Sequence, residues 1–177
     1  MASVIGNEAL RFQFLADSEK LTDREKELYK QLVRPDNKND GMFLMSGSVL
    51  SESLHTLSQL LEKYYGQKVV MIIDEYDVPL DKAWQEGYYD QMVKLVRNIF
   101  IQALKTNDSL YFAVLTGCLR ISRESIFTGL NNPKILSVTD VRFEEAFGFT
   151  DREVQELLSY YGLGERYELI REWYDGY

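Results

Sequence analysis

The sequence has 177 residues, of which 45% are hydrophobic and 27% charged, and its formal net charge at pH 7 is −8. This length suits one domain with a substantial core. The acidic balance argues against a broad nucleic-acid-binding surface, because phosphate contacts need clustered Lys and Arg. No apolar run approaches the roughly 18 residues of a membrane span. The single cysteine, Cys118, excludes an intrachain disulfide and suits a reducing compartment, so we expect a soluble cytoplasmic domain.

The N-terminal part of the chain has the pattern of helices. Residues 1–35 read as helical, and Thr22 followed by Glu25 predicts a capping box, in which each residue satisfies a free amide group of the other. Apolar residues recur at helical spacing over 49–65. Gly66 follows directly, and Gly is the typical residue after a helix end.

Two apolar segments, "VVMII" at 69–73 and "LYFAVLT" at 110–116, predict strands. Continuous apolar runs of this length are typical of strands that are buried on both faces of a parallel sheet. A long helix over 86–108 is predicted between them, and this alternation implies a right-handed crossover. "KILSVT" at 134–139 predicts a third, shorter strand.

Two further helices follow in the predicted order. Thr150 and Glu153 form a second capping-box pattern at the start of "FTDREVQELLSYYG", which closes at Gly162. A last helix is expected at about 165–174. The sequence therefore predicts an α/β domain that ends in helices.

Polar residues follow both predicted strands, at the positions where the active sites of parallel α/β sheets form. They are carboxylates after the first strand, and a hydroxyl and two guanidinium groups after the second: Asp74, Glu75, Asp77, Thr116, Arg120 and Arg123. If the strands are neighbours, both sets face one crevice. The acidic set would position a divalent cation and a water, and the Thr and Arg groups would sense or neutralise a γ-phosphate.

Four segments, in this order along the chain, resemble the predicted AAA-ATPase-like family of bacterial proteins: "VVMIIDEYDVPLDKAWQEGYYDQMVKLVRN", "AVLTGCLRISRESIFTGLNN", "FGFTDREVQELLSYYG" and "EWYDGY". Members of this family are P-loop NTPases, often fused to a C-terminal nuclease-like domain of the PD-(D/E)XK type. The resemblance implies a partial P-loop NTPase-type three-layer α/β fold, in which helices flank a short parallel sheet. It implies an incomplete AAA-ATPase-like core at 1–148 and a lid-like helical segment of the same domain at 149–177.

The resemblance also implies roles for individual residues. Asp74 matches the Walker B aspartate that holds Mg²⁺, and Glu75 matches the general base that activates the attacking water. Thr116 and Arg120 match the sensor positions after the next strand. We therefore expect Glu75 and Arg120 to be catalytic, Thr116 and Arg123 to bind the cofactor, and Asp74 to bind the metal, with Mg²⁺ and ATP as cofactors of the complete protein.

The phosphate-binding loop of the family is missing from the sequence. No G-x-x-x-x-G-K-[ST] occurs in the 177 residues, and the nearest Gly- and Ser-containing segment, "MSGSVLSES" at 45–53, has no Lys. Without the backbone cradle and its Lys, a triphosphate loses its main anchor. We therefore expect the chain to correspond to the part of the domain after the P-loop, and to bind no nucleotide tightly by itself.

Two other hypotheses stay open. In the first, the chain is a non-enzymatic α/β module that acts by interaction or oligomerisation, with a second copy as its partner. In the second, it is a hydrolase that uses Asp74, Glu75 and Asp77 directly on a metal, although no His is available nearby as a further ligand. For Asp77, which precedes Val78 and Pro79, we favour a helix cap over a metal ligand.

Overall fold

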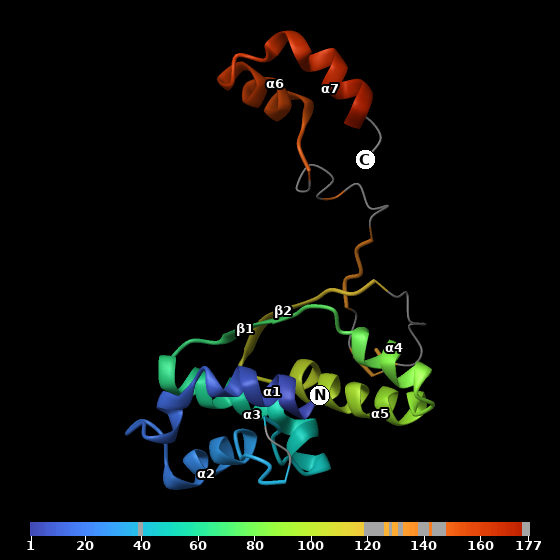
Figure 1. The fold of residues 1–177 in the computed structure, drawn as a ribbon. Helices are drawn as coiled ribbons and strands as arrows, with labels where there is room; N and C mark the ends of the chain where they lie inside the picture. The colour runs from blue at the N-terminus through green and yellow to red at the C-terminus, as the bar shows by residue number, and fades with distance from the viewer. Residues whose placement is uncertain are drawn as a thin grey trace. The chain divides into compact units, whose positions relative to one another are not determined.

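The fold consists of two compact units, Met1–Asn132 and Pro133–Tyr177. The computed structural model describes residues 1–38, 41–118, 126–127, 129–130, 133–137, 142 and 148–174. This described part contains seven α-helices and a two-stranded parallel sheet, so the fold is mixed α/β, as predicted (Figure 1). The role of 149–177 as a lid stays a prediction. None of the described helices is both long enough and apolar enough to cross a membrane.

The first unit begins with a layer of helices. These are α1 (Ala2–Leu10), a 3₁₀ turn (Gln13–Ala16), α2 (Asp23–Leu32) and α3 (Gly47–Tyr65). The predicted capping box is confirmed at the start of α2, where Thr22 Oγ1 accepts from the Glu25 amide and Glu25 Oε2 accepts from the Thr22 amide at 2.7 Å. Gly66 ends α3 at φ 70°, a left-handed conformation that glycine adopts without a steric penalty.

Both predicted strands are confirmed, and they pair in parallel. β1 (Val69–Ile73) lies beside β2 (Leu110–Leu115). The crossover between them consists of α4 (Val78–Gln85), α5 (Tyr89–Phe100) and a π-helical continuation (Ile101–Lys105). The predicted single helix over 86–108 is therefore shorter, and α4 is an additional helix that begins next to a proline.

Helices cover one face of this sheet, on which α1, α3 and α5 lie (Figure 1). Ile73 and Leu115 pack there against a core that includes Val96 and Phe100. The opposite face carries four exposed side chains, Val70, Ile72, Phe112 and Val114, which we call the open sheet face. The prediction that both strands are buried on both faces is wrong for the first unit, because its described helices pack against one face.

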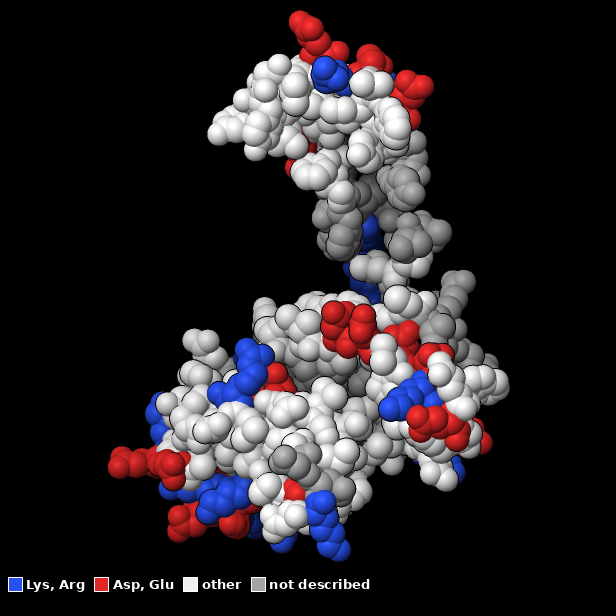
Figure 2. Space-filling model, viewed as in Figure 1, with Lys and Arg blue, Asp and Glu red and all other residues white. Residues whose placement is uncertain are grey.

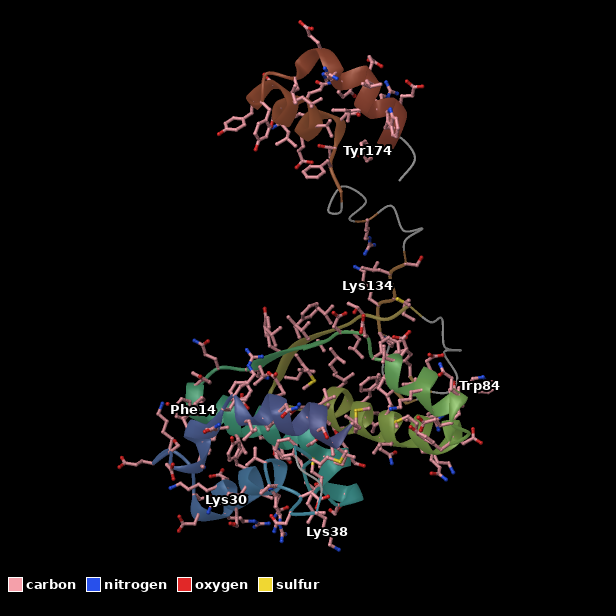
Figure 3. The ribbon with its side chains drawn as sticks, viewed as in Figure 1. Phe14, Lys30, Lys38, Trp84, Lys134 and Tyr174 are labelled. Carbon is pink, nitrogen blue, oxygen red and sulfur yellow. The ribbon has the colours of Figure 1, made fainter. Side chains whose placement is uncertain are left out.

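The predicted third strand is not formed where the structure describes it. Residues 134–137 have no regular secondary structure, and 138–139 lie outside the described residues. Lys134, labelled in Figure 3, is exposed. A short segment becomes a stable strand only when it pairs with a neighbour. No described residue pairs with 134–137 in a β-ladder.

The second unit contains two helices, α6 (Asp151–Tyr160) and α7 (Tyr167–Tyr174), joined through a 3₁₀ turn (Gly164–Arg166). The second predicted capping box is confirmed, since Thr150 and Glu153 exchange side-chain and backbone hydrogen bonds at the start of α6. Tyr167 Oη donates to Asp151 Oδ1 at 2.8 Å and ties α7 to α6. The helices expected at the end of the chain are therefore present.

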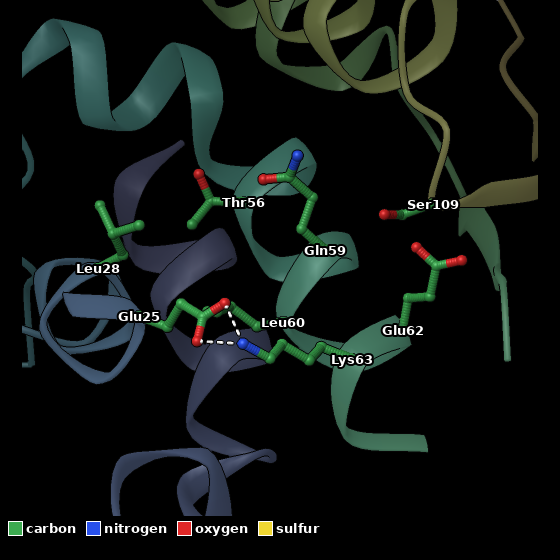
Figure 4. A pocket seen from close by; sticks show the side chains of 8 residues that line it. All are labelled: Glu25, Leu28, Thr56, Gln59, Leu60, Glu62, Lys63 and Ser109. Atoms are coloured by element: carbon green, nitrogen blue, oxygen red, sulfur yellow. Dashed lines mark hydrogen bonds and ion pairs between the residues drawn. The ribbon is translucent and has the colours of Figure 1, made fainter. Parts of the chain in front are cut away.

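Charged side chains of both signs are interspersed over the first unit on the face shown in Figure 2. One ion pair joins α2 to α3 in the lining of a groove of about 410 Å³ (Figure 4). Lys63 Nζ lies 2.8 Å from Glu25 Oε1 and 2.7 Å from Oε2. Hydrogen bonds, first from Lys63 and then from Thr22, lower the pKa of the Glu25 carboxyl from 4.5 to about 2.

This pair makes the stability of the first unit depend on pH. Because the folded-state pKa of Glu25 is lowered, its contribution is present above the unfolded pKa of 4.5 and is lost as the pH falls towards about 2. We expect Glu25→Gln to flatten the fall in the free energy of unfolding across this window, measured by urea denaturation at a series of pH values. Glu27→Gln is the matched control on the same helix, because Glu27 meets Lys30 only at the surface, at 3.5 Å. An equal slope in the Glu25 variant and the wild type would contradict this assignment.

Candidate functional site

The carboxyl ends of β1 and β2 lie side by side. The backbone ladder continues past both strands, since the Thr116 amide donates to the Ile73 carbonyl at 2.9 Å and the Tyr76 amide donates to the Thr116 carbonyl at 3.0 Å. Parallel pairing therefore brings Thr116 next to the acidic segment that follows β1. This is the juxtaposition that the sequence predicts.

Asp74, Glu75 and Thr116 form one hydrogen-bonded cluster. The Thr116 hydroxyl donates to Asp74 Oδ1. The Glu75 amide donates to the same oxygen at 3.1 Å and reaches Thr116 Oγ1 at 3.3 Å. Thr116 and the Glu75 amide therefore orient Asp74 Oδ1, and no described residue bonds to Asp74 Oδ2.

Glu75 has a left-handed backbone conformation, with φ 51°. Among the described residues it is the single non-glycine residue with a positive φ. For an L-residue this conformation costs about 1–2 kcal/mol, and such strained residues concentrate at functional sites. The conformation turns the chain sharply between β1 and α4 and leaves Glu75 exposed. Sequence reasoning had no signal for it, because Glu does not favour this region.

The loop after β1 is held against the loop after β2 by a close contact. Asp77 is 3% exposed, and an ideal Cβ at Gly117 would lie 2.8 Å from its Oδ1 and 2.7 Å from Tyr76 Cε1. The Tyr76 ring in turn packs against Phe100 and Phe127. Burial, and then the charge of Asp77, raise the pKa of the Tyr76 phenol. Only glycine fits at 117 without moving these groups.

The sequence predicted the position of Asp77 at a helix start, but it gave no prediction for the contacts of Tyr76 and Gly117. Asp77 occupies the N-cap position of α4, as predicted, but its side chain makes no capping hydrogen bond. Asp77 is buried beside Gly117, and among the described residues Asp74, Glu75 and Asp77 do not form a group of three that could hold a metal ion. The one available signal for Gly117 was its place directly after a strand, where glycine often marks a close backbone approach.

The remaining predicted site residues, Arg120 and Arg123, lie outside the described residues, so their roles stay predictions.

The segment 45–53 contains the start of α3, in which Ser46 caps the helix by accepting from the Val49 amide at 3.3 Å. This geometry is that of an ordinary helix start and does not follow a strand.

The oxygen atoms at the strand ends suit Mg²⁺ better than a transition metal. Mg²⁺ is commonly held by one or two carboxylates together with substrate phosphates and water, and Asp74 offers such a carboxylate beside the Thr116 hydroxyl. In the part of the chain that the structure describes, no three His, Cys, Asp or Glu residues are placed to hold a metal by themselves. The cluster therefore fits an ion that is shared with a phosphate ligand.

Comparison with known proteins gives this geometry a family context. Residues 8–127, which include both strands and the whole Asp74–Thr116 cluster, match the sequence model of the AAA-ATPase-like family, described as predicted AAA-ATPase. The chain belongs to this family. The matched residues of this AAA-ATPase-like chain include the acidic segment after β1 and Thr116 after β2. The fusion to a nuclease-like domain stays a prediction.

One curated relative is an uncharacterized protein in the vnfD 5′ region of Azotobacter chroococcum mcd 1, which is 33% identical over 113 residues. The match covers 63% of this chain and 22% of the relative, so the matched part spans about a fifth of that protein's length. No solved structure matches the chain. The family assignment of this AAA-ATPase-like chain therefore rests on sequence.

Proposed function

We propose that the strand ends form the Walker B and sensor half of an Mg²⁺-dependent ATP-hydrolysing site in the complete protein. The observation that carries this proposal is the hydrogen bond from Thr116 to Asp74 across the carboxyl ends of two neighbouring parallel strands. Ligands of open α/β sheets bind at this edge. Membership of the AAA-ATPase-like family supports a nucleotide as the ligand.

Each residue of the cluster has a distinct role in this proposal. Asp74 and Thr116 would hold Mg²⁺, which, when bound, neutralises charge on the phosphates. Thr116 and the Glu75 amide keep Asp74 Oδ1 in place, so the carboxylate is oriented before the ligand arrives. The Glu75 carboxylate takes the proton of the attacking water as general base. Arg120 and Arg123 would act on the γ-phosphate.

The 177 residues lack the glycine-lysine loop that anchors a triphosphate. We therefore expect this chain alone to bind Mg·ATP with a dissociation constant near or above about 1 mM, or roughly −4 kcal/mol, and to release no phosphate. With Mn²⁺ in place of Mg²⁺, the nucleotide complex should broaden the NMR signals of Asp74, Glu75 and Thr116 first. Titration calorimetry and ¹H–¹⁵N spectra measure the two effects.

Two variants make this test specific. Asp74→Asn should abolish the local broadening by Mn·ATP, whereas Asp81→Asn should leave it unchanged, because Asp81 bonds Gln85 on the surface of α4. Broadening centred elsewhere on the chain would overturn the proposed metal position. Micromolar affinity for Mg·ATP would contradict the need for an external phosphate anchor.

A second candidate function is that of a non-enzymatic interaction or oligomerisation module. The observation that favours it is the open sheet face, which presents apolar side chains to solvent in the first unit. The two functions are compatible, since this face and the strand-end cluster are made by different residues.

A further inference from the structure

We propose that Tyr76 is a positioning residue of the strand-end cluster: packing of its ring holds the left-handed turn at Glu75 and so directs the Glu75 carboxylate to solvent. Tyr76 acts through the residue before it and is not assigned a contact with metal or nucleotide. The conformational part of this inference stands on the contacts of the ring, whereas its consequence for catalysis rests on the proposed function.

The alternation of side chains along β1 reverses at Glu75. Ile73 packs against the helical core, whereas Ile72 and Asp74 are exposed. Because side chains alternate between faces along a strand, an extended chain would direct residue 75 towards the core and residue 76 towards solvent. The structure has the opposite arrangement, with Glu75 exposed and Tyr76 packed against the core. The positive φ of Glu75 lies at the point where the order changes.

Glu75 is also an extra residue in the backbone ladder. The Thr116 amide donates to the Ile73 carbonyl at 2.9 Å, and the Thr116 carbonyl accepts from the Tyr76 amide at 3.0 Å. A regular parallel ladder would use the amide of residue 75 instead, because a strand bonds to one neighbour through every second residue. Glu75 is therefore left out of the ladder as in a β-bulge, and bulges next to active sites commonly re-aim a side chain.

Three segments that are far apart in the sequence enclose the Tyr76 ring. Its centroid lies 6.2 Å from that of Phe100 and 5.3 Å from that of Phe127, and both pairs are edge-on, with interplanar angles of 70° and 71°. The Phe100 and Phe127 rings stack on each other at 12°. The ring edge at Cε1 faces Gly117 so closely that a Cβ there would lie 2.7 Å away. Contacts from α5, from the segment after β2 and from residue 127 therefore fix the ring.

Packing of this ring offsets the cost of the turn. A strained residue persists only where the surrounding structure over-determines its conformation, and the Glu75 side chain is itself exposed. A packed aromatic side chain is one of the larger favourable contributions to a core, and edge-on ring pairs add to it. A small side chain at 76 would lose that contribution. We therefore expect residue 75 to return to a negative φ in such a variant, and its carboxylate to change direction.

NMR spectroscopy of the 177-residue chain tests the conformational part without nucleotide. A positive φ brings the amide and α protons of one residue close together, so Glu75 should give a strong intraresidue NOE between them. Tyr76→Ala should weaken this NOE to the level of residues with negative φ. It should also speed exchange of the residue 76 amide, because the bond to Thr116 opens more often. Tyr76→Phe keeps the ring and should retain both signals.

Tyr89→Ala is the matched control. Tyr89 is also half-buried, packs against the same core and makes an edge-on contact with Trp84 at 5.6 Å (Figure 3). Loss of that ring should lower the melting temperature, as Tyr76→Ala does, and leave the NOE at Glu75 unchanged. Circular dichroism verifies that each variant is folded. If Tyr76→Ala does not fold, Phe127→Leu replaces it, because it removes one ring contact and should weaken the NOE to a smaller extent.

In the complete protein, Tyr76→Ala should lower turnover and leave affinity almost unchanged. We expect kcat to fall by about 10²-fold, the usual cost of a 1 Å misplacement. The KM for Mg·ATP should change little, because Thr116 still holds Asp74. Tyr89→Ala should alter neither quantity.

A strong NOE that persists in Tyr76→Ala would overturn the inference, and so would its loss in Tyr89→Ala or in Tyr76→Phe. A different result would count against the proposed function. If the NOE is lost in Tyr76→Ala and turnover is undiminished, the conformational role of Tyr76 is confirmed and the role of Glu75 as general base is contradicted. The two failures are therefore distinguishable.

Discussion

Glu75→Gln in the complete protein is expected to lower the rate of ATP hydrolysis by about 10²–10⁴-fold, the usual contribution of a general base. Gln keeps the length of the side chain but cannot accept a proton from the attacking water. The Asp74–Thr116 hydrogen bond and the amide of residue 75 stay in place. The affinity for Mg·ATP should therefore be unchanged. Phosphate release gives the turnover number, and a fluorescent nucleotide gives the dissociation constant.

The matched control for this change is Glu86→Gln. Glu86 follows α4 and lies 3.9 Å from Lys82 in an exposed ion pair, away from the strand ends. Its substitution should alter neither turnover nor affinity. Undiminished turnover in the Glu75 variant would refute the assignment of Glu75 as the base, and loss of nucleotide affinity would indicate a binding role.

Gly117→Ala is expected to destabilise the first unit by about 1–3 kcal/mol, the usual effect of overpacking. The added methyl group would lie 2.7 Å from Tyr76 Cε1 and 2.8 Å from Asp77 Oδ1. The Tyr76 ring cannot retreat freely, because it packs against Phe100 and Phe127. Asp77 would have to move instead, and the loop that carries Glu75 would move with it. For a chain of this size the melting temperature should fall by about 2–4 °C per kcal/mol.

Gly47→Ala separates this clash from the general effect of replacing a glycine. Gly47 is the first residue of α3, and a Cβ there would meet no atom within 4 Å. Alanine favours helix over glycine by about 1 kcal/mol, so this variant should be as stable as the wild type or more so. If Gly117→Ala melts at the same temperature as the wild type and leaves the signals of Asp77 unshifted, the close contact between the two loops is refuted.

Local chemistry explains which parts of the fold could be predicted. Thr22 and Thr150 each precede a Glu by three residues, and both capping boxes form because the required groups are adjacent in the chain. The strands are recognisable because their apolar runs are short and rich in β-branched or aromatic residues. By contrast, α4 has only eight residues and begins at Val78, directly after the turn at Glu75 and beside Pro79.

Contacts between distant segments explain what could not be predicted. The Asp74–Thr116 pair was accessible to sequence reasoning, since parallel pairing places the two strand ends together. The contact of Gly117 with Tyr76 and Asp77 depends on how two loops pack side chains, which no single segment encodes. Exposure of Ile72 depends on which elements cover the sheet. An apolar strand sequence indicates that other elements must pack on the strand, but it does not identify those elements.

The left-handed backbone at Glu75 sets thermal stability against the catalytic role proposed for this residue. Glycine would hold this conformation at lower free energy, so selection for stability alone favours Gly at 75, whereas selection for turnover retains Glu. A family member that has stopped hydrolysing ATP is released from the second pressure. We therefore expect the residue at this position to differ between family members. It should be Glu in members that hydrolyse ATP, and Gly or Asn in members that have kept the fold but not the activity.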